Sequence, residues 1–141
     1  MKKLTNIIAS VFIVTMLLSV FVVPASAETI RYKYANSSAF GSNEWENVTE
    51  YKNNGVKIGQ LRWGYDTDWI NEDYCKTKGE SCSTKATLFR YGDSTTYSGP
   101  LASVGSWSTV DLNDIKTDVT FYILWSTNYS GTITDTTIYG W

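Results

Sequence analysis

The fold class is decided by the stretch VTFYILW, residues 119–125. Large apolar residues occupy alternate positions from Val119 to Trp125, and Tyr122 and Leu124 lie between them. A short run that is apolar at both sets of alternate positions, and rich in β-branched and aromatic residues, is typical of a buried β-strand. We therefore predict a central strand that is covered on both faces.

Strand patterns recur on either side of this stretch, in residues 29–34, 48–63, 85–91 and 131–141. Residues 48–63 indicate a hairpin, because Asn53-Asn54-Gly55 is a strong turn signal. Residues 131–141 are rich in Thr and alternate weakly, as expected of an edge strand. Residues 66–80 form the longest segment without a strand pattern. The prediction is an all-β fold, a compact antiparallel β-sandwich with Greek-key-like connections.

The first 27 residues have the pattern of a cleavable secretory signal peptide. Lys2 and Lys3 precede an apolar run at residues 7–23, and Ala25-Ser26-Ala27 places small residues at the positions that signal peptidase reads. The alternative is an uncleaved membrane anchor, because the run approaches a length that spans a bilayer. We expect cleavage after Ala27, a secreted protein of bacterial type without a stable membrane anchor, and one domain at residues 28–141.

The predicted mature chain is acidic and rich in aromatic residues. Removal of Lys2 and Lys3 leaves ten basic and fourteen acidic residues, a net charge of −4, together with six Trp, ten Tyr and three Phe. Nucleic-acid binding needs clustered Lys and Arg, so we expect no nucleic-acid partner. The chain has no His, which excludes Ser-His-Asp and Cys-His catalysis and His-based metal sites.

Cys75 and Cys82 are the only cysteines. In an exported protein the expected state of such a pair is a disulfide, here closing a short loop. The alternative is a redox or metal-binding pair, which the wide spacing and the lack of His disfavour.

Two parts of the chain resemble each other. Residues 32–40 (YKYANSSAF) align with residues 89–97 (FRYGDSTTY), and four apolar positions in residues 45–63 match four in residues 107–125 with unchanged spacing. A duplicated β unit, with copies at 30–65 and 87–127, explains both matches. The alternative is chance similarity in a chain rich in Tyr, Ser and Thr.

Pieces of the second copy, namely Phe89, Tyr97-Ser98-Gly99 and residues 113–117 (NDIKT), resemble the βγ-crystallin motif. The resemblance implies a Greek-key strand pair and a calcium loop. The chain departs from that motif in the longer spacing before Tyr97 and in Asp118, which stands where the family has Ser.

The densest acidic cluster consists of Asp66, Asp68, Glu72 and Asp73. Hard cations such as calcium require several oxygen ligands at short range, so these residues are the candidate metal site and calcium is the candidate cofactor. The alternative is a solvated loop, because Ile70 stands where an EF-hand needs a ligand. Paired carboxylates also leave open a hydrolase.

Exposed Trp and Tyr side chains are the candidate ligand-binding residues, because such rings stack on sugars or anchor a protein partner. Trp63 and Trp125 fall on predicted core faces. The candidates for exposure are Trp69, Tyr65, Tyr129 and Trp141.

Three classes of function follow from these observations. The leading hypothesis is a secreted, non-catalytic binding module that recognises cell-wall or other carbohydrate, or a protein partner. The second is a secreted antibacterial or membrane-active toxin, and the third is a hydrolase that depends on carboxylates or calcium. The lack of His-based catalytic groups favours binding over catalysis.

Overall fold

The computed structural model describes residues 29–36, 45–66, 72–113 and 118–140, and in these residues the chain forms nine strands. They are β1 (Thr29–Ala35), β2 (Trp45–Asn53), β3 (Val56–Asp66), β4 (Glu72–Gly79), β5 (Thr84–Arg90), β6 (Thr95–Ser98), β7 (Trp107–Asn113), β8 (Val119–Trp125) and β9 (Ile133–Ile138).

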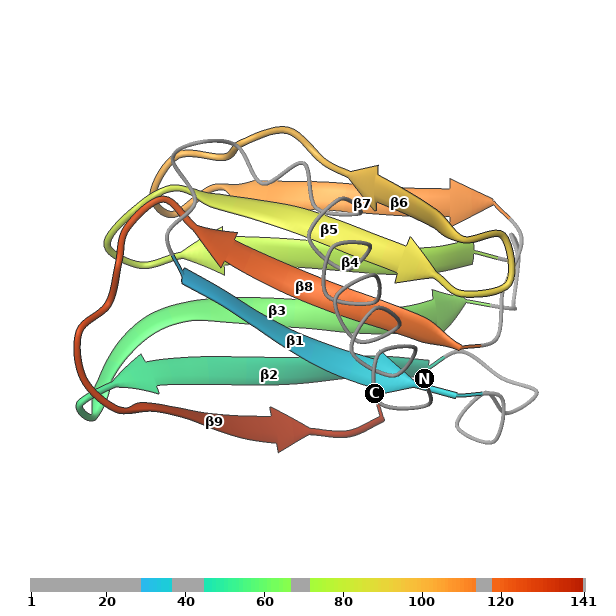
Figure 1. Ribbon diagram of the computed structural model, residues 1–141. Coiled ribbons are helices and arrows are strands. Elements are labelled where there is room, and N and C mark those ends of the chain that lie inside the picture. The colour runs from blue at the N-terminus through green and yellow to red at the C-terminus, as the bar shows by residue number, and fades with distance from the viewer. Residues whose placement is uncertain (1–28, 37–44, 67–71, 114–117, 141) are drawn as a thin grey trace, which may run out of the picture.

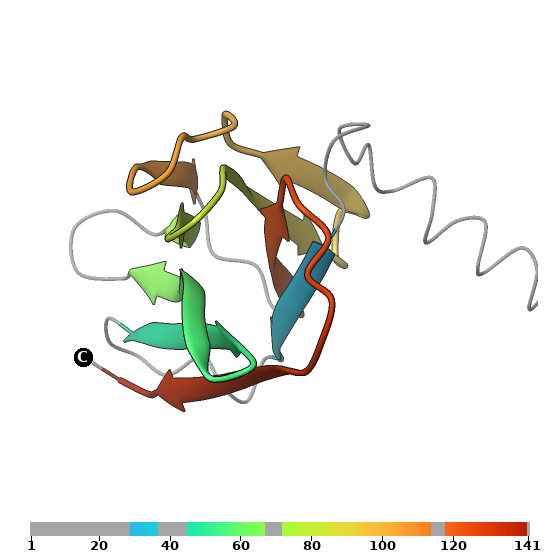
Figure 2. The same ribbon diagram turned by 90° about the vertical axis from the view of Figure 1, so that its left-hand side faces the viewer.

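The strands form two antiparallel sheets that lie face to face (Figures 1 and 2). Sheet A has the order β1-β8-β5-β6, and sheet B has the order β7-β4-β3-β2-β9. The predicted all-β sandwich is therefore confirmed. Strand β8 is buried at all seven positions and pairs with β1 on one side and β5 on the other, as predicted for a central strand.

The core lies between the sheets, where each strand contributes alternate side chains. Two aromatic pairs join the layers. The ring centroids of Trp63 in β3 and Phe121 in β8 are 5.5 Å apart, and those of Tyr51 in β2 and Trp125 in β8 are 5.4 Å apart. The indole N–H of Trp125 donates to the carbonyl oxygen of Ile58 at 3.0 Å, so its one polar atom is satisfied. The prediction that Trp63 and Trp125 belong to the core is confirmed.

The predicted hairpin is strands β2 and β3, joined at Asn54 and Gly55. Both turn residues have positive φ, 49° for Asn54 and 83° for Gly55, which is the conformation that tight two-residue hairpins require. Strand β9 pairs with β2 and lies at the edge of sheet B, as predicted for the Thr-rich segment. An ion pair between Lys33 in β1 and Asp135 in β9 links the edges of the two sheets along this side of the sandwich.

Strand β4 falls in the segment that showed no strand pattern, so that expectation is wrong. It pairs with both β3 and β7 and is an inner strand of sheet B. Its alternation was obscured because polar residues, Asp73 and Thr77, point into the core beside Cys75. Each finds a partner there: Thr77 donates to the hydroxyl of Thr84 at 3.2 Å, and Asp73 binds Arg90.

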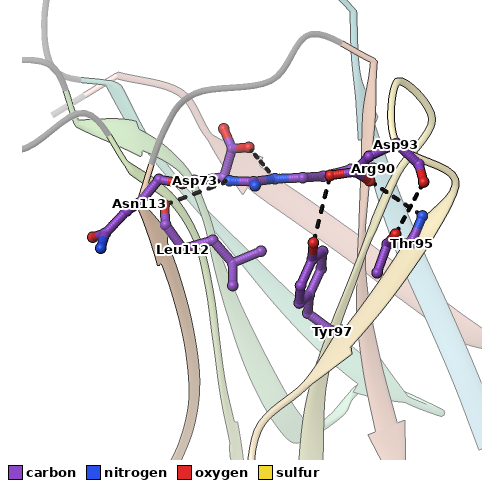
Figure 3. Close-up of polar contacts among 7 residues, drawn as sticks. All are labelled: Asp73, Arg90, Asp93, Thr95, Tyr97, Leu112 and Asn113. Atoms are coloured by element: carbon purple, nitrogen blue, oxygen red, sulfur yellow. Dashed lines mark hydrogen bonds and ion pairs between the residues drawn. The ribbon is translucent and has the colours of Figure 1, made fainter.

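The ion pair between Asp73 and Arg90 is buried between the two sheets (Figure 3). The Nε of Arg90 in β5 donates to Oδ2 of Asp73 in β4 at 2.8 Å, and the side chains are 5% and 0% exposed. The guanidinium also lies over the ring of Tyr97 in β6, 5.6 Å from its centroid. One arginine thus connects β4 of sheet B with β5 and β6 of sheet A.

The predicted disulfide between Cys75 and Cys82 is wrong, because both cysteines are free thiols. Cys75 is buried in the middle of β4, where its Sγ lies 3.5 Å from the carbonyl oxygens of Thr87 and Tyr122. The extended strand places Cys75 about 13 Å from Gly79 at its end, and Cys82 follows in the next turn. A disulfide requires the Cα atoms of its two cysteines to lie within about 7 Å of each other, and the extended strand keeps Cys75 too far from Cys82 for this.

The predicted duplication gains no support from the strand pairing. Strands β2 and β3 form a hairpin within sheet B, whereas the matching strands β7 and β8 lie in different sheets. The repeat remains a prediction from the sequence.

The predicted signal peptide, residues 1–27, lies outside the described residues, and its cleavage remains a prediction. In the part of the chain that the structure describes, no helix has the length and apolarity needed to cross a membrane.

Candidate functional site: a tyrosine face on sheet A

Five aromatic side chains gather on the outer side of sheet A. Successive side chains of a strand point to opposite faces, so the residues between the core positions of β1, β5 and β8 point outward. We call this group the tyrosine face; it consists of Tyr32, Tyr34, Phe89, Tyr91 and Tyr122. Strand β8 lies between β1 and β5 (Figure 1). The outward side chains of β1 and β5 therefore lie on either side of those of β8.

The rings form two contacting groups, Tyr32 with Tyr122, and Tyr91 with both Tyr34 and Phe89. The centroids of Tyr32 and Tyr122 are 5.8 Å apart, those of Tyr34 and Tyr91 are 6.0 Å apart, and those of Phe89 and Tyr91 are 4.7 Å apart. The last two pairs meet edge to face, an arrangement that aromatic quadrupoles favour. Tyr34 lies in β1, and Tyr91 directly follows β5 on the other side of β8, so their contact extends the aromatic surface across β8.

Three of the rings remain open to solvent. Tyr32 is 63% exposed, and Tyr34 and Tyr91 are each 49% exposed. Tyr122 is covered, and this burial raises its pKa to about 12. The tyrosine face therefore has a buried ring at its centre, in β8, and exposed rings on both sides of β8.

Hydrogen bonds hold two of the exposed rings in place. The hydroxyl of Tyr34 donates to Oδ1 of Asp118 at 2.8 Å, and this hydrogen bond raises the pKa of Tyr34 above its usual value. The hydroxyl of Thr120 donates to that of Tyr91 at 3.4 Å. The rings are thus partly immobilised before any ligand arrives, which lowers the entropy lost on binding.

The aromatic residues predicted from the sequence are placed differently. Tyr65 is only 1% exposed, so its predicted exposure is wrong. Tyr129 is half-buried and packs edge to face on Trp125, with centroids 6.0 Å apart. Its hydroxyl lies 2.6 Å from that of Ser81, and burial raises its pKa to about 12. Trp69 and Trp141 lie outside the described residues.

The predicted metal site is only partly described. Asp73 is committed to Arg90 in the core and is not part of a solvated loop. Asp66 and Glu72 end β3 and begin β4, but their side chains lie outside the described set, as does all of Asp68. Among the described side chains, no group of three or more Cys, Asp or Glu is placed to hold a metal ion. Calcium binding remains a prediction from the sequence.

The tyrosine face was not predicted, because exposed aromatic residues were expected in loops rather than on a sheet. The signal was nevertheless present: Tyr32 and Tyr34 share one face of the predicted first strand, and the internal similarity aligns them with Phe89 and Tyr91. In the structure Tyr32 and Tyr34 lie in β1 and Phe89 lies in β5, the two strands that flank β8, and Tyr91 directly follows β5.

No protein-family model matches this chain, and no curated protein or solved structure is significantly similar to it.

Proposed function

We propose that the protein is a non-catalytic module that binds an uncharged polysaccharide, such as a cell-wall glycan, on the tyrosine face. The observation that carries this proposal is the exposure of Tyr32, Tyr34 and Tyr91 on one sheet face, in contact with further rings. Exposed aromatic side chains that gather on one face, rather than lie singly, mark a binding site on a small protein.

The chemistry of the face favours a sugar chain. A phenol ring offers an apolar surface for the C–H face of a pyranose and a hydroxyl for its polar groups. For the three exposed rings, those of Tyr32, Tyr34 and Tyr91, the charged side chain that forms a hydrogen bond among the described residues is the carboxylate of Asp118, which accepts from Tyr34. Rings that present hydroxyl groups beside one anion suit an uncharged ligand better than an acidic one.

The test is a binding assay with insoluble cellulose, chitin and β-1,3-glucan, which are three uncharged polysaccharides. The variants Tyr32→Ala, Tyr34→Ala and Tyr91→Ala each remove one exposed ring, and we expect each to weaken binding roughly three- to tenfold, the range for one aromatic contact. The matched control is Tyr139→Ala, which removes a tyrosine that is 66% exposed near the end of sheet B. Circular dichroism verifies that the variants are folded.

Several outcomes contradict the proposal. If none of the three polysaccharides retains the wild type, or if the three variants bind as well as Tyr139→Ala, the tyrosine face is not a glycan site. Capture of an extracellular protein that depends on these tyrosines would assign the face to a protein partner. Dye release from liposomes, measured in parallel, would instead support the membrane-active alternative.

A further inference from the structure

The outer face of sheet B carries a second set of side chains, which are partly or fully exposed except for Val48, at 8% exposure. The strand register aligns them into two adjacent rows that cross all five strands. The first row is Trp107, Lys78, Gln60, Glu50 and Thr136. The second row is Thr109, Lys76, Arg62, Val48 and Ile138. Five strands at their usual spacing make each row about 19 Å long.

An aromatic ring with two cations forms one end of these rows. Trp107 is 37% exposed at the edge strand β7. The guanidinium of Arg62 lies 5.0 Å from the centroid of its ring, and the ammonium of Lys78 lies 5.1 Å from it. Both are within the range of cation–π attraction, so two positive charges are held beside one exposed indole.

A hollow forms the other end. A shallow pocket lies between β2, β3 and β9. Its lining consists of Lys52 and of five residues of the two rows, namely Val48, Glu50, Gln60, Thr136 and Ile138. The aromatic end and the hollow are therefore joined along a continuous track, which we call the sheet B track.

The sheet B track is positively charged although the chain as a whole is acidic. The two rows contain three cations, Arg62, Lys76 and Lys78, against the single carboxylate of Glu50. Glu50 is already paired with Lys57 at 2.7 Å. Among the described residues, neither Lys76 nor Lys78 has an acidic partner within ion-pair distance.

Arg62 is also incompletely paired. Its nearest acidic atom is an oxygen of Glu46 at 3.7 Å, and its Nε has no hydrogen-bond partner among the described residues. The next row of the sheet contains Asp111 and Glu46, so negative charge borders the track on one side. This border confines an anionic ligand to the two cationic rows.

We propose that the sheet B track is a second binding site, which takes an acidic polysaccharide with ring carboxylates. One sugar ring stacks on Trp107. The carboxylates of this sugar and of the next sugar pair with Arg62, Lys76 and Lys78, and the polysaccharide continues across the strands to the hollow. The planar guanidinium of Arg62 suits a carboxylate, which it can bind through two parallel hydrogen bonds. An aromatic stacking surface beside cations distinguishes this ligand from an anionic membrane, whose attraction needs more basic residues and an apolar face.

The test is a titration of the full protein with polygalacturonate, followed by tryptophan fluorescence and calorimetry. Methyl-esterified polygalacturonate has the same backbone without the charges and is the matched ligand control. We expect Lys76→Gln and Lys78→Gln each to weaken binding about threefold, and Trp107→Ala to weaken it about tenfold. Lys85→Gln is the matched control variant, because Lys85 lies on the outer side of sheet A. It should bind as the wild type does.

The outcomes separate this site from the tyrosine face. Tyr34→Ala should leave polygalacturonate binding unchanged, whether or not that variant affects uncharged glycans. The proposal is overturned if the wild type does not bind polygalacturonate, if the esterified polymer binds equally well, or if Lys78→Gln and Trp107→Ala bind like Lys85→Gln. Tighter binding to phosphatidylglycerol vesicles or to duplex DNA would also overturn the assignment to a glycan.

Discussion

Replacement of Arg90 by Leu should be among the most destabilising single changes in this domain. The change leaves the carboxylate of Asp73 without its cation at a position that is 0% exposed. It also removes the guanidinium from the ring of Tyr97 and so weakens a connection between the two sheets. Loss of one partner of a buried ion pair costs about 3–5 kcal/mol, a large part of the roughly 6–17 kcal/mol expected for a domain of this length.

The assay is equilibrium unfolding in urea, with the free energy of unfolding extrapolated to water. An exposed ion pair supplies the control: Lys57 lies 2.7 Å from Glu50, with both side chains more than a third exposed. Lys57→Gln should cost less than about 1 kcal/mol. The double variant Asp73→Leu/Arg90→Leu should be more stable than Arg90→Leu alone, because it leaves no unpaired charge in the core.

Two results would refute this reasoning. A cost below about 1 kcal/mol for Arg90→Leu would mean that water reaches the carboxylate of Asp73. A double variant that is less stable than the single one would mean that the pair contributes through packing rather than charge.

Three further predictions concern thiols, glycines and pH. Burial raises the pKa of Cys75 to about 12, so a thiol reagent should modify only Cys82 in the native protein and both cysteines in urea. Rapid reaction of both cysteines in the native protein would contradict the burial of Cys75, and reaction of neither in urea would contradict the assignment of free thiols. Gly79→Ala should cost about 1–3 kcal/mol, because a Cβ there would clash with the carbonyl oxygen of Cys82. Gly92→Ala should be tolerated, because a Cβ at Gly92 would meet nothing within 4 Å, and equal urea midpoints for the two variants would count against the tight turn at Gly79. Burial raises the pKa of Tyr122 to about 12, so the folded state holds the phenol proton more tightly than the unfolded state does. The free energy of unfolding should therefore fall as the pH rises from about 10 towards 12, and a urea midpoint that stays constant or rises over this range would contradict the prediction.

The parts of the fold that could be predicted are those with a local signal. Strand β8 was evident because it is apolar at both sets of alternate positions, and the β2–β3 hairpin was evident from its turn residues. Strand β4 was missed because Asp73 and Thr77 interrupt its apolar face, and their polar groups are satisfied only by residues distant in the chain. Strand β6 was missed because it has only four residues.

The sequence indicated that the candidate site would be an aromatic surface, but not which residues would form it. Aromatic richness indicated a binding surface, yet which rings are exposed depends on which strands become neighbours. Tyr34 and Tyr91 are 57 positions apart in sequence and meet because β1 and β5 both pair with β8. The expected disulfide failed for a related reason, since an extended strand carries Cys75 away from Cys82.

The most direct test of the tyrosine face is chemical-shift mapping of ¹⁵N-labelled protein titrated with cellohexaose and chitohexaose. We expect the largest amide shifts in β1, β5 and β8, around Tyr32, Tyr34 and Tyr91, and an unchanged indole signal for Trp107 on sheet B. Shifts confined to sheet B, or no shift with either oligosaccharide at saturating concentration, would contradict it.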